Sequence, residues 1–122
     1  MKGKVNARRE AIVRFRVCGR GSKRQSVNAI IDTGYNGSLT LPPAVIRSLG
    51  LRRIGESDAE LGDGRIVSFD VYAGAIEWCD QRIAIDIDEA RTEPLIGMEL
   101  LNGHEVNIRV ERNGYVNIWP IE

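Results

Sequence analysis

The chain has few of the residues on which metal, disulfide and membrane proteins depend. Its 122 residues include two cysteines, Cys18 and Cys79, and one histidine, His104. The two cysteines lack the close spacing of metal ligands, so we expect reduced thiols, no metal site and no cofactor. There is neither a long apolar run nor an apolar leader after the basic N-terminus. The sequence therefore predicts a cytoplasmic protein without a membrane partner.

Aromatic residues are also scarce, at 6% of the chain, whereas there are 13 glycines. Short runs rich in Val, Ile and Leu are separated by glycine-containing turns, which is typical of all-β proteins. The length suits one domain with its own core and is too short for two. We therefore expect a single all-β domain over residues 1–122, with residues 1–10 as a flexible basic segment.

The balanced net charge conceals an asymmetry. Residues 1–24 contain nine basic side chains and one acidic side chain, whereas residues 25–122 contain eight basic and sixteen acidic ones. Such a basic segment can bind nucleic acid or an acidic partner. The alternative, which we favour, is that these basic groups face acidic ones within the chain or across a dimer, because Arg14 and Arg16 alternate with apolar residues as on the outer face of a strand.

The pattern along the chain predicts short strands, two short helices and tight turns. Pro42-Pro43 and Gly50 mark the start and stop of the first helix. Asn113-Gly114 is a sequence favoured in two-residue type I′ hairpins. The expected strands are 11–17, 27–31, 38–41, 59–61, 65–67, 68–78, 82–87, 94–97, 106–110 and 115–119, and the expected helices are 43–49 and 98–102.

Asp32 stands at the end of an apolar run, directly after Ile30 and Ile31, and is followed by Thr33 and Gly34. A carboxylate at the end of a buried strand is unfavourable unless it is hydrogen-bonded, shared or used in chemistry. Taken alone, the three residues are also compatible with an ordinary turn. Two further motifs at defined spacing favour an active-site loop.

The three motifs occur in a fixed order along nearly the whole chain. They are Asp32-Thr33-Gly34 after a strand, Gly62-Asp63-Gly64 at a hairpin tip about thirty residues later, and Leu95-Ile96-Gly97 before a short helix. This arrangement resembles the retropepsin-like aspartic proteases. The residue sequences that begin at Asp32 and at Pro94 are most similar to those of the small bacterial members. The resemblance implies a closed acid-protease β-barrel with a flap hairpin and one or two short helices.

The resemblance also implies a role for each motif. Asp32 would be the catalytic carboxylate, Thr33 would bond across a two-fold axis, and Gly34 would let two loops approach. The flap tip over the substrate would be formed by Gly62, Asp63 and Gly64. The hydrophobic support beneath the active-site loop would be formed by Leu95, Ile96 and Gly97. The chain departs from the viral members at Tyr35, where they have a small residue, and its flap lacks their run of glycines.

Aspartic proteolysis uses two carboxylates that share one proton. The chain has one Asp-Thr-Gly, so Asp32 needs its copy, Asp32′, from a second subunit. The expected protein is thus a homodimeric aspartic endopeptidase acting on peptides or proteins. For the dimer seam we expect the termini, because an apolar strand over Tyr115–Trp119 would otherwise leave an exposed edge.

Other titratable residues offer weaker candidates. Asp63 has ordinary turn chemistry, and Asp86 and Asp88 alternate with isoleucines as on a solvated strand face. His104 follows a helix end, where a histidine is usually a favourable cation. For Trp78 and Trp119 we expect a place in the core or in a dimer interface.

Two alternative functions remain open. The first is a catalytically weak or inactive dimer of the same fold that binds peptides. The second gives the basic N-terminal hairpin a role with nucleic acid, which we rank last because no recognition motif or aromatic interleaving accompanies the charge.

Overall fold

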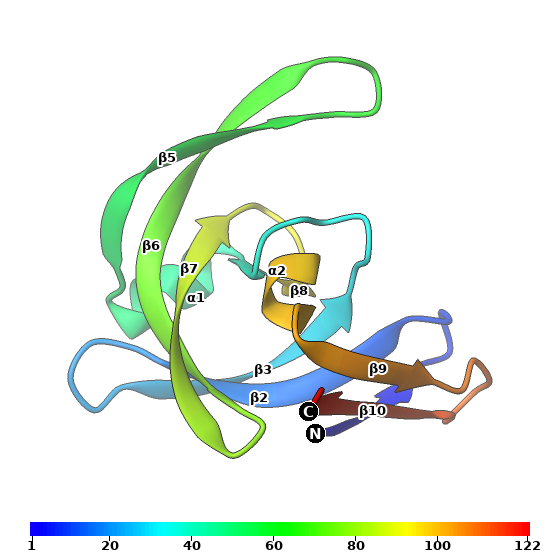
Figure 1. Ribbon diagram of the computed structural model, residues 1–122. Coiled ribbons are helices and arrows are strands. Elements are labelled where there is room, and N and C mark those ends of the chain that lie inside the picture. The colour runs from blue at the N-terminus through cyan, green and yellow to red at the C-terminus, as the bar shows by residue number, and fades with distance from the viewer.

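The computed structural model describes residues 1–122 as ten strands and two short helices (Figure 1). Neither helix is long and apolar enough to cross a membrane. The elements in chain order are β1 (Lys2–Val5), β2 (Ala11–Cys18), β3 (Arg24–Ile31), β4 (Leu39–Leu41), α1 (Pro43–Leu49), β5 (Arg52–Glu60), β6 (Ile66–Trp78), β7 (Gln81–Glu89), β8 (Leu95–Ile96), α2 (Met98–Leu101), β9 (His104–Ile108) and β10 (Tyr115–Pro120).

Six of the strands form a closed barrel in the order β6, β7, β4, β8, β3, β2. The ring closes where β2 pairs with β6 through Val17–Ile76 and Cys18–Ala75. Strands β1, β10 and β9 extend from β2 as an antiparallel ribbon, and the β5–β6 hairpin rises above the barrel (Figure 1). The expectation of an all-β closed barrel with a protruding hairpin and two short helices is confirmed.

The barrel is filled by alternate residues of its strands. On β2, the side chains of Val13, Phe15 and Val17 are buried, whereas Arg14 and Arg16 are exposed. This is the alternation that the sequence predicts, because successive side chains of a strand point to opposite faces. Burying each such Val, Leu, Ile or Phe contributes about 1.5–3 kcal/mol.

The helix expected over 43–49 is confirmed as α1. Pro43 begins it, and Gly50 ends it in the left-handed region at φ +63°, where glycine has no Cβ penalty. The Gly50 N–H donates to the carbonyl oxygens of Arg47 and Ile46 and so satisfies the last turn.

Two expectations about local structure are wrong. Residues 2–5 do not belong to a flexible segment, because β1 is paired on both sides, with β2 and with β10. Asn113-Gly114 does not form a two-residue type I′ hairpin: Asn113 is at φ +62°, but Gly114 does not have a positive φ. The two-residue turn with positive φ at both positions is instead Cys79–Asp80, between β6 and β7.

Gly114 is required for a different reason. A Cβ at Gly114 would lie 1.9 Å from the carbonyl oxygen of Arg109, because the β9–β10 connection folds back on itself. The expected open edge is also misplaced. Strand β10 lies between β1 and β9, so β9 and β5 are the edges of the sheet.

Candidate active site

Asp32 lies immediately after β3, at the start of a loop that folds back on it. Its backbone N–H donates to the Ile96 carbonyl at 2.9 Å, and its own carbonyl accepts the Tyr35 N–H at 3.1 Å. One carboxylate oxygen accepts the Gly34 N–H at 3.0 Å, while the other has no hydrogen-bond donor within the chain. The half-buried Asp32 carboxylate is therefore fixed through one oxygen and leaves the other available.

Thr33 and Gly34, which follow Asp32, are both exposed. The Thr33 hydroxyl has no hydrogen-bond partner within the chain. The turn therefore presents a hydroxyl and a bare backbone at the surface, next to the Asp32 carboxylate.

The segment Leu95–Gly97 lies beneath this loop. Strand β8 pairs in parallel with β3 and antiparallel with β4, so it bridges the two strands that flank the loop. Ile96 is fully buried, and the Gly97 N–H donates to the Ser38 carbonyl at 3.0 Å. A Cβ at Gly97 would lie 2.1 Å from the Gly37 carbonyl oxygen, so only glycine fits there without displacing the loop.

Helix α2 continues this support. The Met98 N–H donates to the Tyr35 carbonyl at 2.8 Å, and the Glu99 N–H donates to the Gly37 carbonyl at 3.1 Å. These bonds tie the backbone of the loop to the first turn of α2. The loop is thus held from below by β8 and α2 together.

Tyr35 and Asp88 form a contact that the sequence did not reveal. The Tyr35 hydroxyl donates to an Asp88 carboxylate oxygen at 2.5 Å. The expectation that Asp88 lies on a solvated face is wrong, because the loop folds over the end of β7 and half-buries this carboxyl group. The tyrosine at position 35 could have indicated such a contact, because a buried tyrosine hydroxyl usually has a hydrogen-bond partner.

Burial raises the pKa values of both Tyr35 and Asp88. Burial raises the pKa of Tyr35 well above its ordinary value, and the hydrogen bond to Asp88 adds to this shift. Burial also raises the pKa of Asp88, although the hydrogen bond from Tyr35 opposes the increase. The Tyr35 ring also lies against Gly37 and Gly97, where an added Cβ would come within 2.8 Å of it. Tyr35 therefore connects the loop to β7 and to the segment beneath it.

The β5–β6 hairpin arches above the loop and ends in an exposed tip at Gly62–Gly64 (Figure 1). Gly64 has φ +85°, and its N–H donates to the Leu61 carbonyl at 2.9 Å. The Asp63 carboxylate accepts bonds from the Arg65 backbone N–H at 3.1 Å and from the Arg65 Nε at 2.6 Å. The hairpin tip is thus a turn braced by its own charges, and Asp63 is engaged within it.

A groove of about 770 Å³ lies between the loop and this hairpin. Its floor is formed by residues 34–38 of the loop and by the side of β7 that carries Asp86 and Asp88. Its wall is formed by residues 54–60 of β5 together with Phe69 and Val71 of β6. The groove is open to solvent, and Asp32 is two residues from Gly34, which lines it.

His104 and Trp78 lie away from this groove. The indole Nε1–H of the buried Trp78 donates to His104 Nε2 at 3.2 Å, and His104 Nδ1 is 3.1 Å from the Asn102 carbonyl. His104 is thus a hydrogen-bond partner of the core residue Trp78. Trp78 is a core residue, as expected, whereas Trp119 is exposed.

Comparison with proteins of known structure identifies the fold. The sequence matches no protein-family model and no curated protein. The structure is similar to that of a retropepsin-like aspartic protease from Rickettsia conorii, with a TM-score of 0.56 and 12% sequence identity over 100% of this chain and 91% of that one. The chain therefore has the retropepsin-like fold, as the order of its three motifs predicts.

Proposed function

We propose that the protein is a homodimeric aspartic endopeptidase that hydrolyses peptide bonds through an Asp32/Asp32′ pair. The observation that carries the proposal is the position of Asp32 within a retropepsin-like fold. Its carboxylate lies on a supported loop beside a peptide-sized groove, and one of its oxygens is free of intramolecular bonds.

The chemistry follows from bringing two such carboxylates together. Two carboxylates about 3 Å apart cannot both ionise, so the pair retains one proton over a wide pH range. The ionised oxygen takes a proton from a bound water, whose oxygen attacks the peptide carbonyl carbon. The protonated partner polarises the carbonyl oxygen, and a proton then passes to the amide nitrogen as the C–N bond breaks.

The proposal requires a second copy because one chain supplies a single Asp32, and two candidate partners within the chain are engaged elsewhere. Asp63 is bonded to Arg65 at the flap tip, and Asp88 is bonded to Tyr35. The C-terminal end of the chain offers a surface for association: Tyr115 and Trp119 of β10 and Ile121 just beyond it are 44%, 40% and 62% exposed, while Val116 and Ile118 are buried. Aligned exposed apolar side chains of this kind support a protein interface.

The test is cleavage by the wild type and by Asp32→Asn of a mixed peptide library from pH 4 to pH 8. Asparagine keeps an oxygen that can accept the Gly34 N–H, so the variant is expected to fold normally while its kcat/KM falls at least 1,000-fold. Asp80→Asn is the matched control, because it removes an exposed carboxylate of the β6–β7 turn, which lies outside the groove and the flap, and leaves the proposed pair intact. Cleavage by Asp32→Asn at the wild-type rate would falsify the assignment.

A second function, peptide binding without turnover, is favoured by the flap tip. The Asp63–Arg65 ion pair braces a turn that must close over substrate. In that case the wild type and Asp32→Asn would bind the same peptides, and neither would release products after long incubation. Product formation by the wild type alone would exclude this alternative.

A further inference from the structure

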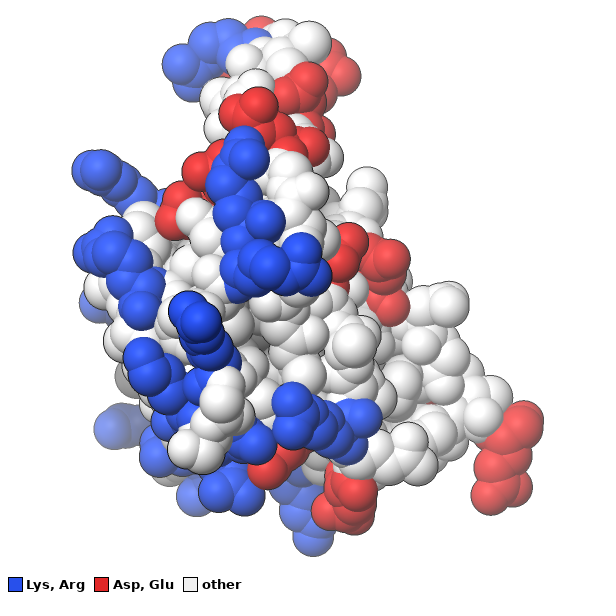
Figure 2. All heavy atoms as spheres, turned by 90° about the vertical axis from the view of Figure 1, so that its left-hand side faces the viewer, with Lys and Arg blue, Asp and Glu red and all other residues white.

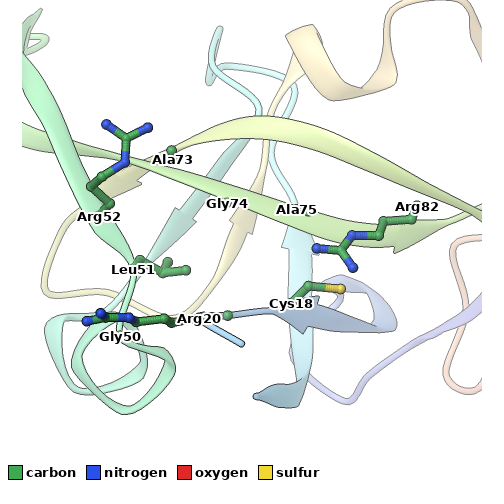
Figure 3. A pocket seen from close by; sticks show the side chains of 10 residues that line it. Cys18, Arg20, Gly50, Leu51, Arg52, Ala73, Gly74, Ala75 and Arg82 are labelled. Atoms are coloured by element: carbon green, nitrogen blue, oxygen red, sulfur yellow. The ribbon is translucent and has the colours of Figure 1, made fainter. Parts of the chain in front are cut away.

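A second hollow lies on the barrel wall, at the base of the β5–β6 hairpin (Figure 3). It has a volume of about 650 Å³, and three arginines, Arg20, Arg52 and Arg82, surround a floor of small and apolar residues. We call it the basic hollow. The rest of its lining consists of Cys18, Gly19, Gly50, Leu51, Ala73, Gly74 and Ala75.

The hollow exists because β6 changes its pairing partner along one edge. Strand β5 pairs with β6 as far as Ala73, and β2 pairs with it from Ala75 onward. Gly74, between them, has no register partner on that edge. Because β5 and β2 diverge at this point, the wall opens between them.

The three arginines carry uncompensated charge. Arg16, Arg53, Arg65 and Arg109 form ion pairs elsewhere, but Arg20, Arg52 and Arg82 form none. No Asp or Glu lines the basic hollow. In a chain with 17 basic and 17 acidic side chains, this local excess is a property of the fold and not of the composition.

The arginines come from three different segments and surround the floor from two sides. In Figure 3, the Arg82 guanidinium lies near Cys18, while Arg20 and Arg52 lie at the opposite side with their guanidinium groups pointing away from Arg82. Figure 2 shows basic side chains gathered over the body on this face, with acidic ones on the hairpin above. The three arginines therefore match a ligand whose negative charges are spread along its length better than they match a single compact anion.

The face of β6 that forms this floor continues into the groove of the proposed active site. Ala73 and Ala75 line the basic hollow, and Phe69 and Val71 line the groove. Residues two apart on a strand share a face and are separated by about 7 Å. A chain extended along this face would therefore pass from the groove to the basic hollow within a few residues.

We propose that the basic hollow binds an acidic segment of the polypeptide substrate, a few residues from the bond that is cleaved. Arginine binds carboxylates through two parallel hydrogen bonds, and the small residues of the floor leave room for extended side chains. A single-stranded nucleic acid fits less well, because the lining contains no aromatic residue on which bases could stack. The assignment of this segment to the substrate rests on the proposed function, whereas the binding itself does not.

The test measures binding apart from cleavage. Full-length Asp32→Asn protein is titrated into fluorescein-labelled hexaglutamate, hexaglutamine and a twelve-nucleotide single strand, at low and physiological salt, with anisotropy as the readout. We expect hexaglutamate to bind and hexaglutamine not to bind. The combined variant Arg20→Gln, Arg52→Gln and Arg82→Gln should raise the Kd for hexaglutamate at least tenfold.

A variant with the same loss of charge elsewhere provides the control. Arg8, Arg9 and Arg112 are exposed and unpaired, so their replacement by Gln should leave the Kd within twofold. If both triple variants weaken hexaglutamate binding equally, the binding reflects general electrostatic attraction and the proposal is overturned. It is also overturned if the oligonucleotide binds at the hollow more tightly than hexaglutamate does. If the hollow variant does not unfold cooperatively, Arg82→Gln alone is compared with Arg112→Gln.

A cleavage assay then separates the two proposals. For any peptide that the wild type cleaves, adding four glutamates on either flank should raise kcat/KM at one flank, and the hollow variant should lose that gain. Absence of all cleavage with intact hexaglutamate binding contradicts the proposed function alone. Cleavage without any effect of the glutamates, on either flank, contradicts the substrate assignment of the hollow.

Discussion

Tyr35 is the residue whose role the structure changes most. In the sequence it is a departure from the small residue of the viral proteases, whereas in the fold its hydroxyl bonds Asp88 and its ring lies against Gly37 and Gly97. Where the viral proteases have a small side chain, this chain therefore has a large one that lies between the loop and β7 and is hydrogen-bonded to β7.

The first prediction at this scale concerns pH. Because the pKa of Tyr35 is raised in the folded state, the native protein retains a proton that the unfolded chain loses above about pH 10. The stabilisation by Tyr35 is thus complete below that pH and is lost as the pH rises above it. Tyr35→Phe should cost about 1–2 kcal/mol at pH 7, and this cost should shrink between pH 9 and pH 11.

Urea unfolding of the wild type and of Tyr35→Phe at several pH values measures the cost of the substitution. Tyrosinate absorbance provides a parallel readout. Tyr115→Phe is the control, because Tyr115 is exposed and has no side-chain hydrogen bond within the chain. A cost of Tyr35→Phe that stays constant up to pH 11 would contradict the buried hydrogen bond.

Gly97 provides a second residue-scale prediction. A Cβ there would lie 2.1 Å from the Gly37 carbonyl oxygen and 2.6 Å from the Tyr35 ring, so Gly97→Ala should destabilise the fold by about 1–3 kcal/mol. Gly62→Ala at the flap tip has nothing within 4 Å and should change stability by less than about 0.5 kcal/mol. Thermal unfolding of both variants tests this contrast, and equal stabilities would show that the loop is not packed on Gly97 as described.

At the scale of elements, local signals predict the helices and most strands well. Proline and glycine determine the ends of α1 through backbone geometry that needs no distant contact. The β9–β10 connection was predicted wrongly because the folded-back chain near Arg109 decides its shape. Similarly, β1 was missed because its pairing depends on β2 and β10, which are distant from each other in sequence.

Asn113 gives the prediction at this scale. It has φ +62° in the β9–β10 connection, a region that asparagine and glycine tolerate better than other residues. Asn113→Ala should cost about 1 kcal/mol, whereas Asn113→Gly should be close to neutral. Equilibrium denaturation distinguishes them, and equal stability of the two variants would mean that the left-handed conformation is not maintained in solution.

At the scale of the whole molecule, the proposed function requires a second chain, because one chain supplies a single Asp32. We expect sedimentation equilibrium at micromolar concentration, near pH 5 and pH 7, to show a dimer. Trp119→Glu with Ile121→Glu places charge on the exposed apolar residues at the end of β10 and just beyond it, and should weaken the dimer at least tenfold, with parallel loss of cleavage. Val110→Glu is the control, because Val110 is also an exposed apolar residue, at 69%, but lies in the β9–β10 connection.

Two results would contradict this arrangement. A wild-type protein that stays monomeric at every concentration, with and without peptide, would leave Asp32 without a partner. A dimer that persists in the Trp119/Ile121 variant would place the interface on another surface, such as the free edges of β5 or β9.

The sequence by itself determined the all-β character, most of the turns and the positions of the three motifs, because alternation, glycine and proline act over a few residues. The order of those motifs was enough to predict the retropepsin-like fold. Only the tertiary structure decided that Tyr35 would meet Asp88 and that three unpaired arginines would surround one hollow. These contacts join segments that are tens of residues apart, so they depend on how the barrel closes and not on any local pattern.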